Sequence, residues 1–321
     1  MTLLAVDALS VGFGSARASV PVVDAVSFSL AKGETLGLVG ESGCGKTVTV
    51  MSAIRLLPSP PAQVTGGSVR FDGIDLITAP KAQLHALWGN RIGVVFQNPM
   101  TSLNPTFTIG FQLVEALRLH RPVSEPQARE QVMAMLDRVG INSPQRRLQQ
   151  YPHELSGGLR QRVMIAMALI CHPELLIADE PTTALDVTLQ AQILDLLRSL
   201  RDELGMGILM ITHDLGVVAE FCDRVAVMYA GRIVETAAVH ELFRAPRHPY
   251  TRGLMESIPR MDTPREQPLA TIEGMVPPPG RRGAGCAFAD RCTRALERCR
   301  AGTPPLAGEG GHAVACWNAA P

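Results

Sequence analysis

The chain has 321 residues, of which 46% are hydrophobic and 19% are charged, so it has enough apolar material for one large domain and a smaller one. Lysine and arginine together number 30, as do aspartate and glutamate, which makes the formal net charge zero. This composition excludes a disordered protein, and without a basic tract we do not expect nucleic acid as a partner.

No apolar run approaches the roughly 18 residues that a membrane-spanning helix needs. The first residues, MTLLAVDALSVGF, have no basic leader, and Asp7 interrupts their apolar run. They therefore predict a strand rather than a signal peptide. We expect a protein of the cytosol, where thiols stay reduced, so disulfides are the less favoured use of the seven cysteines.

Short apolar runs alternate with helical patterns in the first 240 residues, which is typical of an α/β fold. Four of these runs are predicted as buried strands, TLGLVG at 35–40, RIGVVFQ at 91–97, ELLIADE at 174–180 and GILMITH at 207–213. Between the last two, apolar residues recur at helical spacing up to Leu204, and Gly205 suits the end of that helix. Residues 222–237 predict a hairpin with an Ala-Gly turn.

The remaining segments predict how the chain is divided. Residues 98–160 lack strong strands and contain helical patterns such as FQLVEALRLH, so they predict a helical insertion. From about residue 245 the chain is rich in proline, glycine and arginine, which is typical of linkers and surface loops. We therefore expect an α/β domain at 1–244, with its helical subdomain at about 98–160, and a small, loop-rich domain with cysteines at 245–321.

The segment GESGCGKT at 40–47 matches G-x-x-x-x-G-K-[ST] and stands between a predicted strand and a predicted helix. Its glycines let backbone N–H groups surround a phosphate at the N-terminus of the helix. Lys46 would reach the β- and γ-phosphates, the Thr47 hydroxyl would bind Mg²⁺, and Cys44 is expected to be a small filler. The predicted nucleotide-binding residues of this loop are Gly40, Glu41, Ser42, Gly43, Cys44, Gly45, Lys46, Thr47 and Val48.

The segment LLIADEP at 175–181 predicts a buried strand that ends in two carboxylates. Asp179 would hold Mg²⁺, directly or through water, and Glu180 is the candidate general base for a hydrolytic water. Two acids could also mark an ordinary junction between a strand and a loop. Their order after the phosphate loop favours the catalytic role.

A third motif, LSGGLRQR at 155–162, places Ser-Gly-Gly at the start of a predicted helix, where an anion can bind. With these motifs in this order, the sequence resembles the ATP-binding cassette (ABC) family over residues 1 to about 240. The resemblance implies a P-loop NTPase fold, in which a RecA-like core carries an antiparallel β subdomain and a helical subdomain.

The resemblance also implies a set of site residues. Two cassettes would face each other head to tail, with each ATP between the phosphate loop of one subunit and the Ser-Gly-Gly helix of the other. Three residues would act in the partner's site, namely Ser156, Gly157 and Gly158. Ala184, Leu185 and Asp186 match the D-loop, of which Asp186 is counted among the nucleotide-binding residues. Gln97 matches the Q-loop that senses the γ-phosphate and Mg²⁺, His213 matches the switch histidine, and Phe13 is the candidate for stacking on adenine. The catalytic set is Glu180, His213 and Gln97.

Longer strings narrow the resemblance, among them FQNPMTSLNP at 96–105 and RHPYTRGLMESIP at 247–259. They are similar to ATPase subunits of dipeptide and oligopeptide importers. This implies a peripheral ATPase on the cytoplasmic face of the bacterial inner membrane. Its partners would be a paralogous ATPase (a homodimer is less favoured), two permeases and an external peptide-binding protein. Nickel or another small solute is an alternative cargo. A cassette ATPase without a transport role is a further alternative, against which the single cassette and the absence of a basic tract argue.

The last cysteines, Cys286, Cys292, Cys299 and Cys316, have the spacing C-x5-C-x6-C-x16-C. Four thiolates suit tetrahedral zinc or an iron–sulfur cluster, and a metal centre would stabilise so loop-rich a segment. Some peptide-importer ATPases with a similar tail hold a [4Fe–4S] cluster, so the resemblance favours iron, with zinc as the alternative. Reduced or paired thiols remain open, and His312 could replace one thiol as a ligand.

Overall fold

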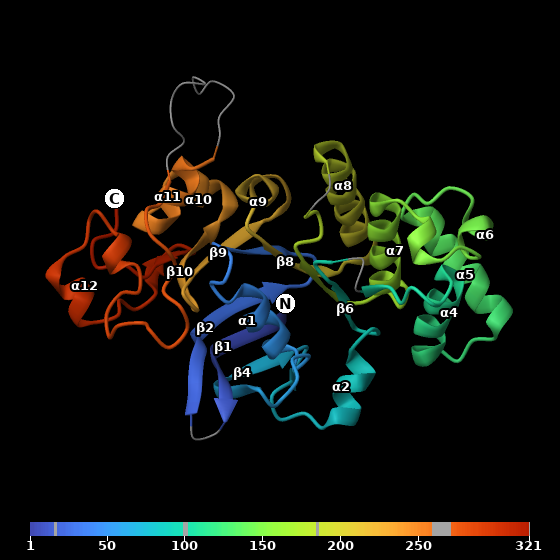
Figure 1. The fold of residues 1–321 in the computed structure, drawn as a ribbon, viewed down its shortest axis with the longest axis horizontal. Coiled ribbons are helices and arrows are strands. Elements are labelled where there is room, and N and C mark those ends of the chain that lie inside the picture. The colour runs from blue at the N-terminus through green and yellow to red at the C-terminus, as the bar shows by residue number, and fades with distance from the viewer. Residues whose placement is uncertain (16–17, 99–101, 184–185, 259–270, 321) are drawn as a thin grey trace. The chain divides into compact units, whose positions relative to one another are not determined.

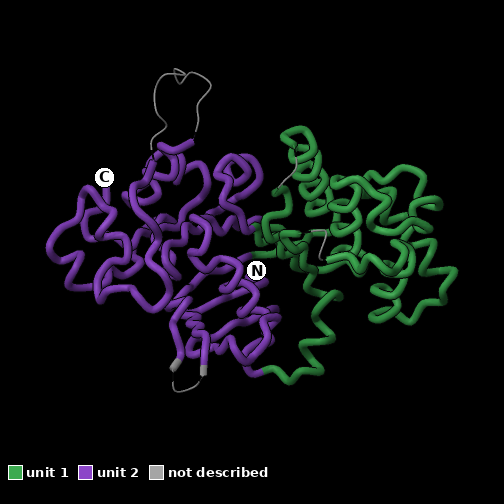
Figure 2. Tube along the Cα trace, in the orientation of Figure 1, with its two compact units in different colours: residues 1, 31–34, 79–210 green, residues 2–30, 35–78, 211–321 purple. Residues whose placement is uncertain are grey.

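The computed structural model describes the chain except residues 16–17, 99–101, 184–185, 259–270 and 321 (Figure 1). The chain divides into two compact units, which Figure 2 colours separately. The first unit consists of residues 1, 31–34 and 79–210, and the second of residues 2–30, 35–78 and 211–321. Because the second unit holds residues on both sides of the expected boundary between 244 and 245, that boundary remains a prediction.

A four-stranded sheet in the second unit contains the N-terminal segment. Its strand order is β2-β1-β4-β5, with β1 (Thr2–Ser15), β2 (Ala18–Ala31), β4 (Ala62–Phe71) and β5 (Ile74–Asp75). β1 pairs antiparallel with β4, from Leu4 opposite Phe71 to Phe13 opposite Ala62. Leu4 and Phe71 are fully buried, so the predicted N-terminal strand is confirmed.

A second run of strands in the same unit carries the phosphate loop. β3 (Thr35–Val39) pairs parallel with β9 (Arg224–Tyr229) and leads towards α1 (Lys46–Ala53). β9 and β10 (Arg232–Ala238) form the predicted hairpin, and its turn residues Ala230 and Gly231 have positive φ angles of 44° and 80°. The helices that follow β8 and β10 are α9 (Leu215–Phe221), α10 (Val239–Arg244) and α11 (Pro249–Glu256).

The C-terminal segment contains more regular structure than the sequence predicts. β12 (His312–Val314) pairs with β10, and β11 (Ala307–Glu309) pairs with β12. A 3₁₀ turn, η2 (Ala289–Arg291), and the short helix α12 (Glu297–Ala301) precede them. The sequence does not show these elements within the loop-rich segment, because pieces this short have no hydrophobic period.

In the first unit, β6 (Ile92–Val95) pairs parallel with β7 (Leu175–Asp179), and β7 lies beside β8 (Gly207–Thr212), whose last two residues belong to the second unit. Each strand lies within a run that the sequence predicts. α8 (Val187–Leu204) buries Ile193, Leu197 and Leu200 of its predicted face. Gly205 ends it with a φ of 64°, as expected.

The described part of residues 98–160 contains helices and no strand, as predicted (Figure 1). After α2 (Lys81–Leu87) and β6 come α4 (Ile109–His120), α5 (Glu125–Arg138), α6 (Pro144–Arg147), the 3₁₀ turn η1 (Pro152–Glu154) and α7 (Gly157–Leu169). Local signals set their starts: the Thr108 side chain caps α4, and Ser124 with Gln127 forms a capping box at α5.

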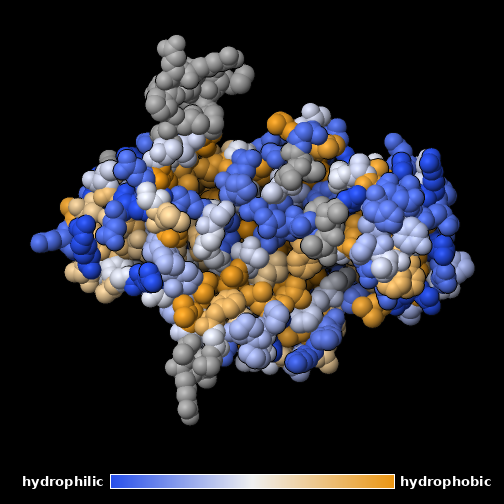
Figure 3. Space-filling view, viewed as in Figure 1, coloured by the Kyte–Doolittle hydropathy of each residue, from blue (hydrophilic) through white to orange (hydrophobic). Residues whose placement is uncertain are grey.

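Within the described residues, no helix combines the length and the apolar character needed to cross a bilayer. On the face drawn in Figure 3, hydrophilic residues cover most of α4, α5 and α6, with small apolar patches among them.

Candidate functional site

The phosphate loop joins β3 to α1 in the second unit, as its motif requires. Gly45 is the N-cap of α1, with a φ of 101°. The Lys46 ammonium donates hydrogen bonds to the carbonyl oxygens of Gly40 over 2.7 Å and Glu41 over 3.1 Å. Lys46 is only 6% exposed, so its charge is held inside the curve of the loop.

The surroundings of Gly40 explain why the loop begins with a glycine. Its φ is 153°, and a Cβ atom at this position would lie 2.2 Å from the carbonyl oxygen of Met228 on β9. Any side chain would therefore force the loop away from the strand.

The other loop residues differ in exposure. Ser42, Gly43 and Thr47 are exposed, Val48 is half-buried, and Cys44 is only 1% exposed. Burial raises the pKa of the Cys44 thiol, which keeps it protonated at neutral pH. Its carbonyl oxygen accepts a hydrogen bond from the N–H of Gly231 over 2.8 Å, so Cys44 fills space and ties the loop to the β9–β10 turn.

The strand that ends in two acids lies in the first unit. Asp179 is the last residue of β7 and is 4% exposed, and Glu180 follows with a positive φ of 47°. A left-handed conformation at a non-glycine residue costs about 1–3 kcal/mol and is often found at active sites. Oε2 of Glu180 accepts hydrogen bonds from Nε2 of Gln97 over 2.8 Å and Oγ1 of Thr183 over 2.9 Å. Gln97 and Glu180, two of the three residues assigned to catalysis, are thus joined by a hydrogen bond.

The third, His213, follows β8 and is exposed. Phe13, the candidate for stacking on adenine, is half-buried on β1. Both residues belong to the second unit with the phosphate loop, whereas Gln97, Asp179 and Glu180 belong to the first.

The Ser-Gly-Gly segment opens α7 in the first unit. Ser156 is the N-cap, and its Oγ accepts a hydrogen bond from the N–H of Leu159 over 3.4 Å. Apart from its own helix and chain neighbours, no atom of the described residues lies within 4 Å of a Cβ placed on Gly157, and a Cβ on Gly158 would lie 3.2 Å from Cδ1 of Leu189. The start of this 13-residue helix is therefore open beside small residues, which suits an anion.

The D-loop adjoins the same segment. Oδ1 of Asp186 caps α8 by accepting a hydrogen bond from the N–H of Leu189 over 2.9 Å, and Leu189 is the residue that faces Gly158. Ala184 and Leu185 lie outside the described residues.

The four C-terminal cysteines line one small cavity in the second unit and are all free thiols. Burial raises the pKa of Cys286, and the neighbouring thiols of Cys299, Cys316 and Cys292 add to this effect. Among the described residues, however, no three side chains of His, Cys, Asp or Glu form a group that could hold a metal ion. The thiols therefore converge without forming a metal site.

His312, the alternative ligand, has a different role. Its Nε2 lies 2.7 Å from Oε1 of Glu235, and both residues are buried. The Glu235 carboxylate also accepts hydrogen bonds from the N–H groups of Arg247 over 2.7 Å and His248 over 3.0 Å. Glu235 thus connects β12 to the start of α11, and His312 is committed to that network.

Two partners of the phosphate loop are not predicted by the sequence. Oη of Tyr250 accepts a hydrogen bond from the N–H of Glu41 over 2.8 Å, and the Arg291 guanidinium donates to both carboxylate oxygens of Glu41 over 2.7 and 3.0 Å. Tyr250 lies in the string RHPYTRGLMESIP, and Arg291 lies in GCAFADRC at 285–292, a string of the C-terminal segment that is also similar to the peptide-importer ATPases. Those strings are the only sequence signal for them, and they do not indicate a contact.

Comparisons with known proteins show the family to which the chain belongs. A family model described as "ABC transporter" matches residues 23–183, and one described as "Oligopeptide/dipeptide transporter, C-terminal region" matches residues 234–299. The chain is 52% identical over 317 residues to a Sinorhizobium fredii protein named "Probable peptide ABC transporter ATP-binding protein", with 98% of this chain and 95% of that protein covered. It is also 52% identical over 320 residues to the "Putative peptide import ATP-binding protein" of Brucella ovis, with 97% and 95% covered.

Solved structures confirm the predicted fold. The dimeric ATP-binding cassette MJ0796, in a post-hydrolysis state with ADP and phosphate, matches with a TM-score of 0.66 and 26% identity over 74% of this chain and 98% of that chain. The cbiO1 subunit of Clostridium perfringens, part of the ABC transporter complex cbiONQ, matches with a TM-score of 0.65 and 27% identity over 76% and 91% of the two chains. The chain therefore belongs to the ATP-binding subunits of the ABC transporter family, and it carries the C-terminal region of oligopeptide and dipeptide transporters.

Proposed function

We propose that this chain hydrolyses ATP to energise the import of peptides through a binding-protein-dependent ABC importer. The observation that carries this proposal is the unbroken similarity to peptide ABC transporter ATP-binding proteins, at 52% identity over 98% of the chain. The similarity includes the C-terminal region, which lies outside the matched cassette. The cassette supplies the ATPase chemistry, and the C-terminal region favours peptides over other cargoes.

In this proposal, the phosphate loop (residues 40–48) binds the phosphates of ATP. Lys46 exchanges its bonds to the carbonyl oxygens of Gly40 and Glu41 for bonds to phosphate oxygens. Thr47, Asp179 and Gln97 would supply oxygen ligands for Mg²⁺, which would neutralise charge on the phosphates. The exposed position of Thr47 and the burial of Asp179 fit that use. Phe13 stacks on the adenine.

Hydrolysis is assigned to Glu180. Its carboxylate takes a proton from water as the water oxygen bonds to the γ-phosphorus, and the bond between that phosphorus and ADP breaks to release ADP and phosphate. The hydrogen bond from Gln97 orients the carboxylate, and His213 contacts the γ-phosphate. Ser156, Gly157, Gly158 and Asp186 act on the ATP of a second cassette, so hydrolysis requires the dimer.

The partners in this proposal are two permeases, a second and different ATPase, and an external peptide-binding protein. The location is the cytoplasmic face of the bacterial inner membrane, where the permeases are. In the first unit, a cavity of about 630 Å³ lies along α4 and is lined by Phe111, Val114 and Leu119 among others. Phe107 and Phe111 stack at 4.6 Å between ring centroids and are 44% and 48% exposed. These exposed apolar side chains support docking of a short permease helix on residues 98–160.

We also propose a metal centre at Cys286, Cys292, Cys299 and Cys316, in the form of a [4Fe–4S] cluster, with zinc as the alternative. The convergence of four thiols on one cavity supports it. Metal binding would require the segment to rearrange, because among the described residues these thiols do not form a group that could hold a metal ion. The centre would order the C-terminal segment rather than take part in hydrolysis.

A transport assay tests the main proposal. The neighbouring genes are searched for two permeases and a binding protein, the chain is reconstituted with them, and uptake of a labelled dipeptide and of nickel is measured in parallel. We expect ATP-dependent uptake of the dipeptide alone. Nickel uptake without dipeptide uptake would mean that the cargo is nickel and not a peptide. ATPase activity without any permease genes nearby would favour a cassette without a transport role.

A further inference from the structure

The phosphate loop carries an acidic side chain, Glu41, that is bound by an arginine 250 residues further along the chain. Nη1 and Nη2 of Arg291 donate to the two carboxylate oxygens of Glu41 over 2.7 and 3.0 Å, the paired geometry that is strongest for these groups. The Arg291 side chain is 7% exposed and that of Glu41 is 28% exposed. This ion pair is therefore largely removed from water.

The Arg291 guanidinium is itself held on several sides. It donates to the carbonyl oxygens of Ile272 over 3.0 Å and Glu273 over 2.8 Å, and to Oη of Tyr229 over 3.3 Å. Its Cζ lies 5.8 Å from the centre of the Tyr229 ring and 5.9 Å from that of Phe288. A guanidinium with so many partners has little freedom, so the carboxylate that it binds is fixed as well.

A second contact to Glu41 comes from Tyr250, whose Oη accepts the backbone N–H. Tyr250 is fully buried, and its ring lies 4.6 Å from that of Tyr229 and 5.5 Å from that of Phe288. Phe288 and Arg291 both lie between Cys286 and Cys292. The same short stretch of the C-terminal region thus supports Glu41 through its side chain and through its backbone.

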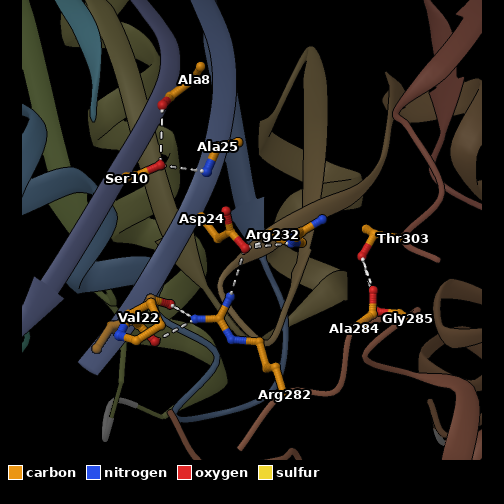
Figure 4. A network of polar contacts seen from close by, with 11 residues as sticks. Ala8, Ser10, Val22, Asp24, Ala25, Arg232, Arg282, Ala284, Gly285 and Thr303 are labelled. Atoms are coloured by element: carbon orange, nitrogen blue, oxygen red, sulfur yellow. Dashed lines mark hydrogen bonds and ion pairs between the residues drawn. The ribbon is translucent and has the colours of Figure 1, made fainter. Parts of the chain in front are cut away.

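The stretch is anchored at its other end by Arg282 (Figure 4). Nη2 of Arg282 donates to the carbonyl oxygens of Pro21 over 2.7 Å and Val22 over 2.8 Å on β2. Its Nη1 lies 3.8 Å from the carboxylate of Asp24, which also binds Arg232. The N–H of Asp24 donates a hydrogen bond to the carbonyl oxygen of Gly231. The N–H of Gly231 in turn donates to the carbonyl oxygen of Cys44 in the phosphate loop. Residues 282–292 therefore contact the loop directly at Glu41, through Arg291, and indirectly at Cys44, through Asp24 and Gly231.

We propose that Arg291 is a positioning residue for ATP binding, and that residues 282–292 brace the phosphate loop through the Arg291–Glu41 ion pair. An unpaired carboxylate at residue 41 would stand in the loop that receives the phosphates and would repel them. Arg291 cancels that charge and holds it in one position. This inference rests on the proposed role of residues 40–48 in binding ATP. It adds a function for the C-terminal region that does not depend on a metal.

The test measures ATP affinity and the kcat and KM of hydrolysis for the full chain in its assembled complex. Arg291→Ala is expected to weaken ATP affinity and raise KM by roughly five- to tenfold, with kcat within about twofold of wild type. Arg300→Ala is the matched control, because Arg300 lies in the same region, its side chain is 65% exposed, and its guanidinium lies 3.9 Å from the exposed carboxylate of Asp290. It should leave affinity and KM unchanged.

Rescue separates positioning from general support of the fold. Adding Glu41→Gln to Arg291→Ala removes the unpaired charge, so the double variant should recover affinity to within about threefold of wild type. Arg291→Lys keeps the charge but loses the paired geometry, so its ATP affinity should lie between those of Arg291→Ala and the double variant. It replaces Arg291→Ala in the test if the alanine variant does not fold.

Wild-type affinity in every folded variant at Arg291, or a double variant as weak as Arg291→Ala, would overturn the inference. Lys46→Ala separates that failure from failure of the proposed site. If Lys46→Ala binds ATP normally, the role of the phosphate loop is wrong. If it binds weakly while the Arg291 variants bind normally, only the role of Arg291 is wrong.

Discussion

The side-chain amide of Gln97 donates a hydrogen bond over 2.8 Å to the carboxylate of Glu180, a residue 83 positions later in the chain. Gln97 follows β6 and Glu180 follows β7, and these two parallel strands are neighbours in the first unit. Residues that follow the carboxyl ends of neighbouring parallel strands meet at one edge of a sheet. This geometry connects the helical insertion, which begins directly after Gln97, to the proposed general base.

Glu180→Gln should retain ATP binding but lose hydrolysis by about 10²- to 10⁴-fold, since an amide cannot take the proton from water. The amide still fills the site, so the variant should accumulate as an ATP-bound dimer. Single-turnover hydrolysis and size-exclusion chromatography with ATP measure the two effects. Lys46→Ala is the contrasting variant, because it should weaken binding of the nucleotide itself. Near-normal turnover of Glu180→Gln in the purified complex would remove Glu180 from the mechanism.

Cysteines placed at Ser102 and Asn104 should form crosslinks with cytoplasmic loops of the permease. Asn104 is exposed and Ser102 half-buried at the start of the helical insertion, near the exposed rings of Phe107 and Phe111 in the sequence. Ser199→Cys, at an exposed serine on α8, serves as the matched control, and the chain without an added cysteine gives the background from native thiols. Crosslinks from residue 199 alone would place the docking surface elsewhere.

Protein purified without oxygen should be brown and contain about four irons per chain if the cysteine segment holds a [4Fe–4S] cluster. Changing all four cysteines to serine should remove the iron and destabilise the C-terminal segment, which protease digestion would detect. The matched control is Cys222→Ser, because Cys222 is buried and lies outside the cavity of the four thiols. A colourless protein with one zinc would indicate the alternative metal. Absence of both metals, with full activity of the quadruple variant, would contradict a metal centre.

Glu174→Gln should lower the free energy of unfolding by about 1 kcal/mol at pH 7, a value kept small because the carboxylate is partly exposed. The hydrogen bond from Arg91, over 2.5 Å, and that from Lys32, over 2.8 Å, lower the pKa of Glu174 to about 2. Because the pKa in the folded state is lower than the unfolded value of about 4.5, this stabilisation is complete above that value and is lost as the pH falls towards 2.

Chemical unfolding from pH 7 to pH 2 measures this dependence. The difference between wild type and Glu174→Gln should shrink across that acidic range. Glu203→Gln, at the more exposed ion pair with Arg138, should change stability by less than about 0.5 kcal/mol. An effect of Glu174→Gln that does not change with pH would mean that its ion pairs do not stabilise the fold.

The order of elements and most of the candidate site could be predicted from the sequence, because their signals are local. Lys46 follows a glycine-rich turn, Asp179 and Glu180 end an apolar run, and Ser156 precedes a helix, so each can be read within about ten residues. The buried strands at 35–39, 175–179 and 207–212 were predictable for the same reason. Their places in the chain also led to the correct family.

The pairing of distant side chains could not be predicted from the sequence and is seen only in the folded chain. His312 was a possible metal ligand in the sequence, but pairing of β12 with β10 places it against Glu235. Arg291 had no predicted role, yet it binds Glu41. Such pairs depend on strands and turns too short to show a period, and on buried charges that need a partner wherever the fold supplies one. A local pattern can predict that a charge must be paired, but the partner is set by how the whole chain packs.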